Sequence, residues 1–239
     1  MDENILSIGI KIELVKPKSR IEDDSNKNVT YVSQIIDMEG DLITCAMPIY
    51  EGHLIPLETG TEFESYFYTK KGIFKGRCKV TSRGKEGNIY ICQLLLMTEL
   101  KKFQRRQFFR LPCTLDVQIT PLREIEMLAY IKNHAMPETL TNPTENGIVV
   151  DLSGGGMRII SNEKYEKGVF IALDFILNVQ GIPLKMQLLG QVIQSFKSET
   201  NELRYDQSVQ FREISRDVQD EIIKYIFEEQ RKLRRKEQR

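Results

Sequence analysis

The chain has 239 residues, enough for one large domain or two small ones. Its 34 basic and 34 acidic side chains cancel, so net charge supplies no general attraction to nucleic acid or anionic lipid. The sequence shows no secretory signal, no apolar run near the roughly 18 residues of a membrane span, and no C-x-x-C pair among its four cysteines. These features predict a cytoplasmic protein with reduced thiols.

The first part of the chain carries short strand-like runs separated by turn residues. Ile10, Ile12 and Leu14 alternate with charged residues, which is typical of a half-buried strand. Further strands are expected at 29–36, 42–46, 62–68, 72–82 and 88–97. Strands at this spacing, without a long helix, predict a small barrel or sandwich.

A basic stretch interrupts this pattern at residues 99–110. Glu99 is its only acid. We interpret the stretch as an interdomain linker that continues into the next strand. Its basic side chains are Lys101, Lys102, Arg105, Arg106 and Arg110.

The remaining residues resume the strand pattern and end in a helix. Strands are expected at 111–120, 147–151, 157–160, 169–177, 184–195 and 203–211. The long insert at 121–146 contains three prolines and a possible short helix at 122–131. After Ser215, a candidate cap, apolar residues recur at helical spacing and basic residues crowd the far end, which suits the helix dipole.

An arginine cluster is the first candidate binding feature. Arg105, Arg106 and Arg110 lie close together, with no acid among their neighbours. A guanidinium can pair bidentately with the O6 and N7 acceptors of guanine, stack on a base or clamp a phosphate. By itself, an R-x-x-x-R spacing is more often a solvated basic linker. The adjacent Phe103, Phe108 and Phe109 could stack on bases, although packing between domains is the favoured interpretation.

The second feature combines an acid, a hydroxyl and three glycines after an apolar run. Asp151 can accept hydrogen bonds from the N1–H and amino edge of guanine or orient an arginine, and Ser153 adds a small donor and acceptor. Gly154, Gly155 and Gly156 permit positive φ and close backbone approach. Alone, D-x-S-G-G-G is more often a tight turn. Together, the two features predict a site for a guanine nucleotide with phosphates.

This pair of motifs resembles the PilZ domain, a bacterial receptor for cyclic di-GMP. The family patterns R-x-x-x-R and [DN]-x-S-x-x-G stand here as Arg106-Gln-Phe-Phe-Arg110 and Asp151-Leu-Ser153-Gly-Gly-Gly156. The resemblance covers roughly residues 104–233. The preceding part is similar in strand pattern to the N-terminal YcgR-type domain. The insert at 121–146 is longer than this resemblance leads us to expect.

The resemblance implies a mainly β fold made of two small barrels. An N-terminal split barrel is expected at residues 1–98 and the basic linker at 99–110. A six-stranded PilZ barrel with a C-terminal α-helix is expected at 111–239.

The resemblance also implies a role for each motif residue. Arg106 and Arg110 would hold guanine edges and phosphates, and Asp151 and Ser153 would contact guanine from the barrel surface. Arg105, just before R-x-x-x-R, is associated in the family with a stacked dimer of the ligand, which favours two cyclic di-GMP molecules per chain. The expected ligand-binding residues are Arg105, Arg106, Arg110, Asp151, Ser153, Gly154, Gly155, Gly156 and Arg158.

By the same resemblance, the protein is expected to be a cyclic di-GMP effector of the flagellar-brake group. Ligand binding would recruit the arginine segment onto the Asp151 loop and change the relative orientation of the domains. The reoriented surface would engage a component of the flagellar motor or stator, such as MotA. Motility would fall, and the cell would shift toward a sessile, biofilm-forming state.

Two alternatives stay open at this point. A nucleic-acid-binding protein would use the stretch Lys101–Arg110 and the basic tail. A degenerate PilZ module would serve only as a scaffold. An enzyme is not expected, because the sequence shows no Ser/His/Asp or Cys/His set, no P-loop and no metal-ligand motif.

Overall fold

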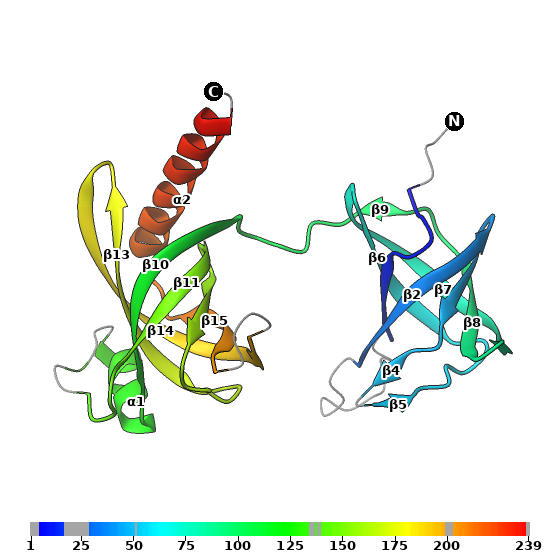
Figure 1. The fold of residues 1–239 in the computed structure, drawn as a ribbon, viewed down its shortest axis with the longest axis horizontal. Coiled ribbons are helices and arrows are strands. Elements are labelled where there is room, and N and C mark those ends of the chain that lie inside the picture. The colour runs from blue at the N-terminus through cyan, green and yellow to red at the C-terminus, as the bar shows by residue number, and fades with distance from the viewer. Residues whose placement is uncertain are drawn as a thin grey trace. The chain divides into compact units, whose positions relative to one another are not determined.

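The computed structural model describes residues 5–16, 29–50, 52–133, 137, 140–198 and 203–237. The chain divides into two compact units, Met1–Arg105 and Arg106–Arg239 (Figure 1). Each unit has its own hydrophobic core. Both units are mainly β, which confirms the predicted fold class.

The N-terminal unit is a ring of six antiparallel strands. Strands β1, β2, β3, β8, β7 and β6 pair in that order, and a pairing between β6 and β1 closes the ring, while β9 adds to β7 and β4 pairs with β5. The long β7 bends around the ring, because its first part pairs with β6 and its last part with β8. The strands are β1 (Lys11–Val15), β2 (Thr30–Glu39), β3 (Leu42–Ala46), β4 (Ile49–Tyr50), β5 (His53–Leu54), β6 (Glu62–Thr69), β7 (Gly72–Glu86), β8 (Ile89–Leu96) and β9 (Lys101–Lys102).

Alternation of apolar and polar residues explains how this ring forms. Ile12 and Leu14 on β1 are fully buried, whereas Lys11 before them is exposed and Glu13 between them is only partly buried. Phe67 on β6 faces the same core, which also holds three of the four free cysteines, Cys45, Cys78 and Cys92. The period-two pattern of the sequence therefore places one face of each strand inward.

The C-terminal unit is a closed barrel of six antiparallel strands, as predicted. The strands follow the order β10-β11-β12-β15-β14-β13 around the barrel. They are β10 (Arg110–Pro121), β11 (Glu145–Ser153), β12 (Gly156–Ser161), β13 (Phe170–Val179), β14 (Ile182–Lys197) and β15 (Tyr205–Arg212). The barrel core contains Leu152 and Ile171, both with no exposed surface.

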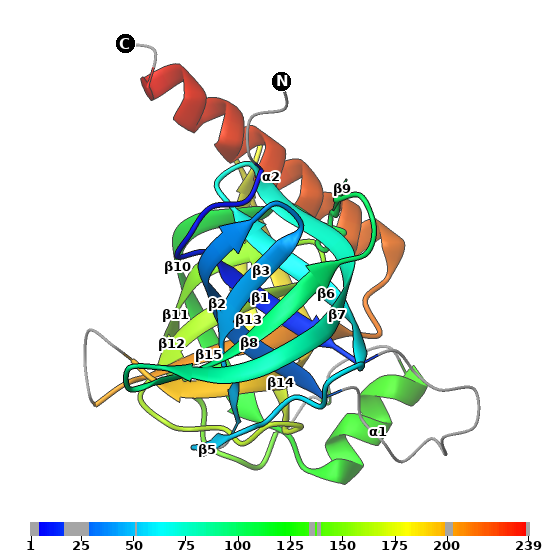
Figure 2. The ribbon, with the colours of Figure 1, turned by 90° about the vertical axis from the view of Figure 1, so that its right-hand side faces the viewer.

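Helix α2 (Arg216–Glu237) packs its first half on the barrel and projects beyond it (Figures 1 and 2). Ile222, Tyr225 and Ile226 join the barrel core, whereas residues 231–236 are exposed. The Ser215 hydroxyl accepts a hydrogen bond from the Val218 N–H over 3.4 Å, so Ser215 caps the helix as predicted.

The insert at 121–146 contains helix α1 (Glu124–Asn133), close to the predicted position. Residues 134–136, 138 and 139 lie outside the described residues. The buried Glu126 carboxylate accepts hydrogen bonds from the N–H of Arg123 and from both the N–H and the hydroxyl of Thr141. Within the C-terminal unit, α1 lies at the end of the barrel opposite to α2 (Figure 1). Glu126 thus ties the two ends of the insert together.

In the parts of the chain that the structure describes, no helix is both long enough and apolar enough to cross a membrane.

Candidate functional site

The pairing of β10 with β11 brings the two predicted motifs together. Arg110, the last residue of the arginine motif, lies directly opposite Ser153, and Pro112 lies opposite Asp151. Residues opposite each other in an antiparallel pair point to the same face and lie close together. Leu111 and Leu152, the alternating neighbours, are buried in the barrel core. Arg110, Asp151 and Ser153 therefore share the outer face of the barrel.

Asp151 belongs to an ion-pair network with Arg158. Arg158 lies opposite Asp151 in the β11–β12 pairing, and its Nε is 3.1 Å from Asp151 Oδ2. The NH1 atom of the same guanidinium is 2.8 Å from Oδ2 of Asp206 on β15. One arginine thus bridges two carboxylates on the face that carries the motif residues. The structure places Arg158 beside the predicted site.

Ser153 and Gly156 form a tight connection between β11 and β12. The Ser153 hydroxyl donates a hydrogen bond to the carbonyl oxygen of Gly156 over 2.9 Å, and the Ser153 side chain is buried. A Cβ atom on Gly156 would lie 2.2 Å from the carbonyl oxygen of Val209. Gly156 is therefore required for the close approach of β15.

The glycine loop does not use the positive φ that glycine permits. Gly154, Gly155 and Gly156 are not among the glycines with a left-handed φ, unlike Gly168, whose φ is +96°. A Cβ atom at any of the three would instead crowd neighbouring residues of the same unit.

The neighbour that crowds Gly154 and Gly155 is Phe108, from the middle of the arginine motif. A Cβ atom at Gly154 would lie 2.8 Å from Phe108 Cδ1 and 3.1 Å from Ile223 Cγ1 of α2. A Cβ atom at Gly155 would lie 3.2 Å from Phe108 Cδ2. The phenylalanine ring therefore packs against the glycine loop and positions the segment between Arg106 and Arg110 there.

Arg105 belongs to a different unit from the other predicted site residues. It belongs to the N-terminal unit, where its NH1 is 3.1 Å from Glu13 Oε2 and 2.8 Å from the Tyr68 hydroxyl. The first residue of the other unit is Arg106. The structure therefore brings together Arg110, Asp151, Ser153, the three glycines and Arg158, whereas the contacts of Arg105 with Glu13 and Tyr68 lie within the N-terminal unit.

Two family models match the chain. The model described as PilZ domain matches residues 104–228, and the model described as flagellar protein YcgR matches residues 8–94. The chain belongs to the PilZ domain family. Its N-terminal unit is the YcgR-type domain that the sequence predicted. A comparison with curated protein sequences finds no match.

Two of the solved structures similar to this chain come from Bacillus subtilis and Escherichia coli. The inhibitor of motility MotI/DgrA from Bacillus subtilis is similar over 94% of this chain and 98% of its own, with 19% sequence identity and a TM-score of 0.73. YcgR from Escherichia coli, solved in complex with c-di-GMP, matches 96% of this chain and 88% of its own, with 15% identity and a TM-score of 0.48. The likeness to MotI/DgrA supports the fold.

The chemistry of the PilZ site suits recognition of an anionic, guanine-containing ligand. The guanidinium groups of Arg106 and Arg110 are donors of the kind that suit phosphates and base edges, and Asp151, which pairs with Arg158, is a carboxylate acceptor. Among the described residues, no group of three or more His, Cys, Asp or Glu side chains could hold a metal ion.

The sequence singled out Phe108 for base stacking or packing between domains, whereas the structure packs it on the glycine loop of its own unit, and three further residues were missed. Phe108 and Gln219 contact the glycine loop, and Glu13 and Tyr68 hold Arg105. Phe108 lies within the arginine motif, and an apolar side chain in a basic segment indicates that the segment packs against another surface. The other three are remote in sequence from the residues they contact, so no local pattern indicates them.

Proposed function

We propose that this protein is a cyclic di-GMP receptor that regulates motility and performs no catalysis. The observation that carries the proposal is the β10–β11 register, which places Arg110 opposite Ser153 with Asp151 on the same face. These are the positions at which a PilZ domain is expected to bind its ligand. Membership of the PilZ family and the presence of a YcgR-type N-terminal unit support the same function.

Each site residue then has a distinct role in binding. Arg106 and Arg110 donate to guanine O6 and N7 or to phosphate oxygens, and Asp151 accepts from the N1–H and amino edge. Ser153 and the glycines Gly154–Gly156 shape the turn so that the ligand can approach the backbone. Arg158 keeps Asp151 oriented through their 3.1 Å ion pair. Arg105 contacts a second, stacked ligand molecule, so two cyclic di-GMP molecules bind per chain.

Selectivity for guanine tests this assignment. Adenine carries an amino donor where guanine carries O6, so it does not suit the arginine donors, and it lacks the N1–H and 2-amino donors that Asp151 would accept from. Equilibrium dialysis with cyclic di-GMP, cyclic di-AMP and GTP is expected to show cyclic di-GMP binding tighter than cyclic di-AMP by about 5- to 150-fold or more, the range for one bidentate arginine–guanine contact. Equal affinity for the two cyclic dinucleotides would contradict the proposal.

We propose that the output is a change in the relative orientation of the two units. Ligand binding orders the arginine segment that joins them, and an order–disorder switch of this kind can bias a two-state equilibrium. The reoriented protein then acts in the cytoplasm as a brake on a flagellar motor or stator component such as MotA, which favours biofilm growth. The relative MotI/DgrA is an inhibitor of motility. Small-angle scattering profiles that are identical with and without saturating ligand would contradict the reorientation.

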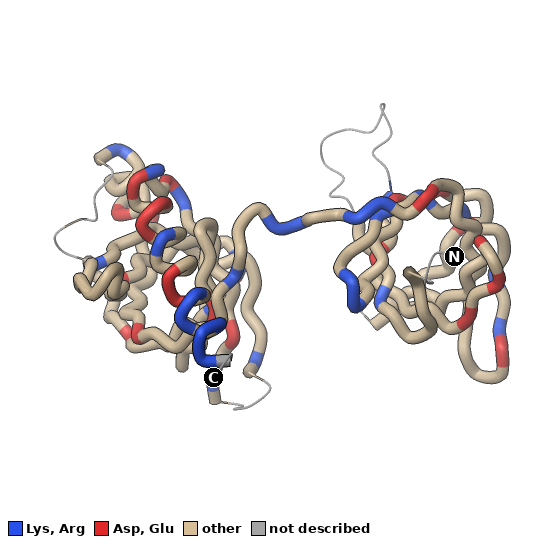
Figure 3. Tube along the Cα trace, turned by 90° about the horizontal axis from the view of Figure 1, so that it is seen from above, with Lys and Arg blue, Asp and Glu red and all other residues tan. Residues whose placement is uncertain are grey.

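Nucleic-acid binding is the competing function that the charge distribution favours. Basic residues lie along the segment that joins the units and at the C-terminal end of α2 (Figure 3). RNA or DNA binding through these residues would weaken steeply with added salt. If duplex or single-stranded nucleic acid bound with such a slope while cyclic di-GMP did not bind, this function would replace the receptor. Binding of neither would leave a PilZ scaffold.

A further inference from the structure

The residues just before the arginine motif are fastened to the N-terminal unit. Lys101 and Lys102 form β9, which pairs with β7, and the Phe103 N–H donates to the Ile73 carbonyl oxygen over 2.8 Å. The Phe103 ring lies 5.1 Å from the Tyr66 ring, centroid to centroid. This part of the predicted linker is therefore a strap on the surface of the first barrel.

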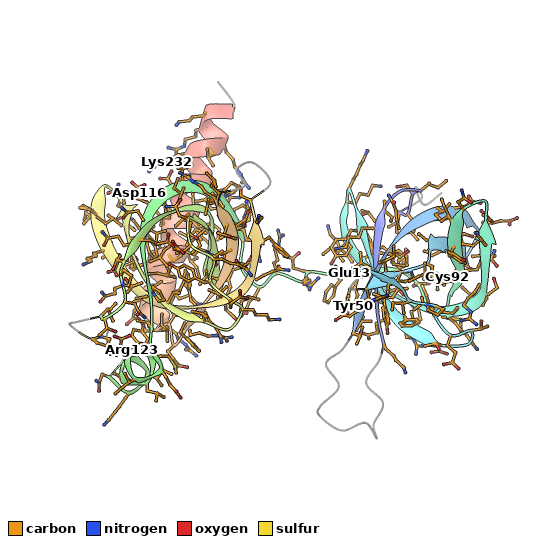
Figure 4. The ribbon with its side chains drawn as sticks, turned by 60° about the horizontal axis from the view of Figure 1, so that its bottom comes forward. Glu13, Tyr50, Cys92, Asp116, Arg123 and Lys232 are labelled. Atoms are coloured by element: carbon orange, nitrogen blue, oxygen red, sulfur yellow. The ribbon has the colours of Figure 1, made fainter. Side chains whose placement is uncertain are left out.

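Arg105 ends the strap in a polar cluster. Its NH1 donates to Glu13 Oε2 on β1 and to the Tyr68 hydroxyl on β6, and the Tyr68 hydroxyl donates to the same Oε2 over 2.7 Å. Lys11 Nζ lies 2.8 Å from the other carboxylate oxygen and 4.8 Å from the Tyr68 ring centroid. We call Glu13, Tyr68 and Arg105 the Arg105 latch; Figure 4 labels Glu13.

The latch is formed around a carboxylate that stays ionised. The Glu13 side chain is only 12% exposed, whereas that of Arg105 is 62% exposed. Although burial acts to raise the pKa of Glu13, hydrogen bonds from Lys11 and Tyr68 and the charges of Lys11 and Arg105 together lower it. The carboxylate is thus a fixed anion on the rigid sheet, and the exposed arginine is the part that can leave.

Phe108, three residues later, is anchored in the other unit. Its ring packs on Gly154 and Gly155, as described above. In sequence, only Arg106 and Gln107 lie between this anchor and Arg105. A ligand that accepts a hydrogen bond from NH1 of Arg105 takes that donor from Glu13 and Tyr68 on the first barrel.

We propose that Glu13 and Tyr68 are positioning residues that compete with the nucleotide for Arg105. This inference rests on the proposed function. A phosphate or guanine acceptor takes the place of the Glu13 carboxylate at the guanidinium, so each binding event that uses Arg105 breaks two hydrogen bonds. The latch therefore lowers the affinity of the protein for cyclic di-GMP, and ligand binding releases the end of the strap from the first barrel.

The size of the effect follows from the exposure of the arginine. A partly exposed ion pair with one additional hydrogen bond changes an equilibrium constant by about two- to fivefold. A mutation that removes the latch should therefore tighten cyclic di-GMP binding by that factor. The effect should appear in the affinity for the ligand molecule that Arg105 contacts.

The test is calorimetric titration of cyclic di-GMP into the full chain and its variants. Glu13→Gln and Tyr68→Phe are expected to bind about two- to fivefold tighter than the unmodified protein. Glu64→Gln is the matched control, because Glu64 on β6 pairs with Lys75 at 2.9 Å and accepts from the Tyr66 hydroxyl at 3.2 Å. Its affinity should stay unchanged.

A double-mutant cycle separates the latch from general effects on the first barrel. In an Arg105→Ala background, Glu13→Gln should no longer change affinity, since no arginine remains to be released. Unchanged or weaker binding by Glu13→Gln and Tyr68→Phe overturns the latch, as does tighter binding that persists without Arg105. Failure of the unmodified protein to bind cyclic di-GMP would instead overturn the proposed function.

Discussion

The side-chain amide of Gln219 donates a hydrogen bond to the carbonyl oxygen of Gly154 over 2.8 Å. Ile223, one turn later on α2, and Phe108 both lie close to the position that a Cβ atom on Gly154 would occupy. The glycine loop therefore contacts both the C-terminal helix and the arginine segment.

Gly154→Ala tests this packing. The new Cβ atom would lie 2.8 Å from Phe108 and 3.1 Å from Ile223, so the phenylalanine ring and its segment must move. We expect cyclic di-GMP affinity to fall roughly tenfold, because displaced arginine donors lose their bidentate geometry. Gly155→Ala, with a nearest approach of 3.2 Å, should have a smaller effect in the same calorimetric titration. An affinity equal to that of the unmodified protein in both variants would mean that Phe108 does not position the arginines.

Gly156→Ala is expected to destabilise the C-terminal barrel itself. A Cβ atom there would lie 2.2 Å from the Val209 carbonyl oxygen, and backbone atoms of β15 cannot move aside without breaking its pairing. Overpacking of this kind costs about 1–3 kcal/mol. Thermal unfolding should show a midpoint lower by several degrees. Gly84→Ala is the control, because its Cβ atom would meet only the Ile91 side chain, at 3.7 Å.

Arg158→Ala should weaken ligand binding with little loss of stability. Its removal leaves Asp151 and Asp206 without their shared cation, so Asp151 loses its fixed orientation. The ion pairs are partly exposed, so the folding penalty should stay below about 1 kcal/mol. We expect a several-fold weaker affinity. Lys185→Ala removes an exposed cation near Asp174 on the same barrel and should bind normally. Equal affinities of the two variants would remove Arg158 from the site.

The buried carboxylate of Glu126 predicts an acid-dependent loss of stability. The hydrogen bond from the Arg123 N–H is the main cause that lowers the pKa of Glu126, and Thr141 adds to it. Because the pKa of Glu126 is lower in the folded chain than in the unfolded chain, the ionised carboxylate stabilises the fold at pH values above its unfolded pKa of about 4.3. This stabilisation is lost as the pH falls through the folded pKa. The unfolding midpoint should therefore drop on acidification below about pH 5.

Two variants on α1 isolate this contribution. Glu126→Gln should lower the midpoint at neutral pH and flatten its acid dependence, because the titrating group is absent. Glu124→Gln changes an exposed carboxylate of the same helix and should leave both unchanged. A Glu126→Gln protein that keeps the full acid dependence would assign that dependence to other carboxylates.

The sequence predicted most of the strands because burial follows alternation. Ile12 and Leu14 are buried where the period-two pattern placed them, and the range 42–46 matches β3. Strands β4, β5 and β9 were missed, since two residues are too few to show a period. Alternation also does not reveal which strands pair; the closed six-stranded barrel came from the family resemblance.

The candidate site was predictable in its motif residues and not in their partners. Arg110 and Asp151 belong to short patterns, and strand pairing brings those patterns together. Glu13 and Tyr68 are 55 residues apart, and Arg105 is 92 residues from Glu13. Contacts over such separations depend on the closure of the first barrel. The strap formed by residues 101–105 could not be predicted from the sequence for the same reason.

The decisive measurement is a calorimetric titration of cyclic di-GMP into the unmodified protein and into Arg106→Ala. We expect saturable binding of two ligands per chain, weakened by about 5- to 150-fold in the variant through loss of one bidentate contact. Arg83→Ala, which changes an exposed arginine on β7, is the control and should bind normally. Absence of binding at high micromolar ligand, or equal affinity of the unmodified protein and Arg106→Ala, would rule out the proposed receptor function.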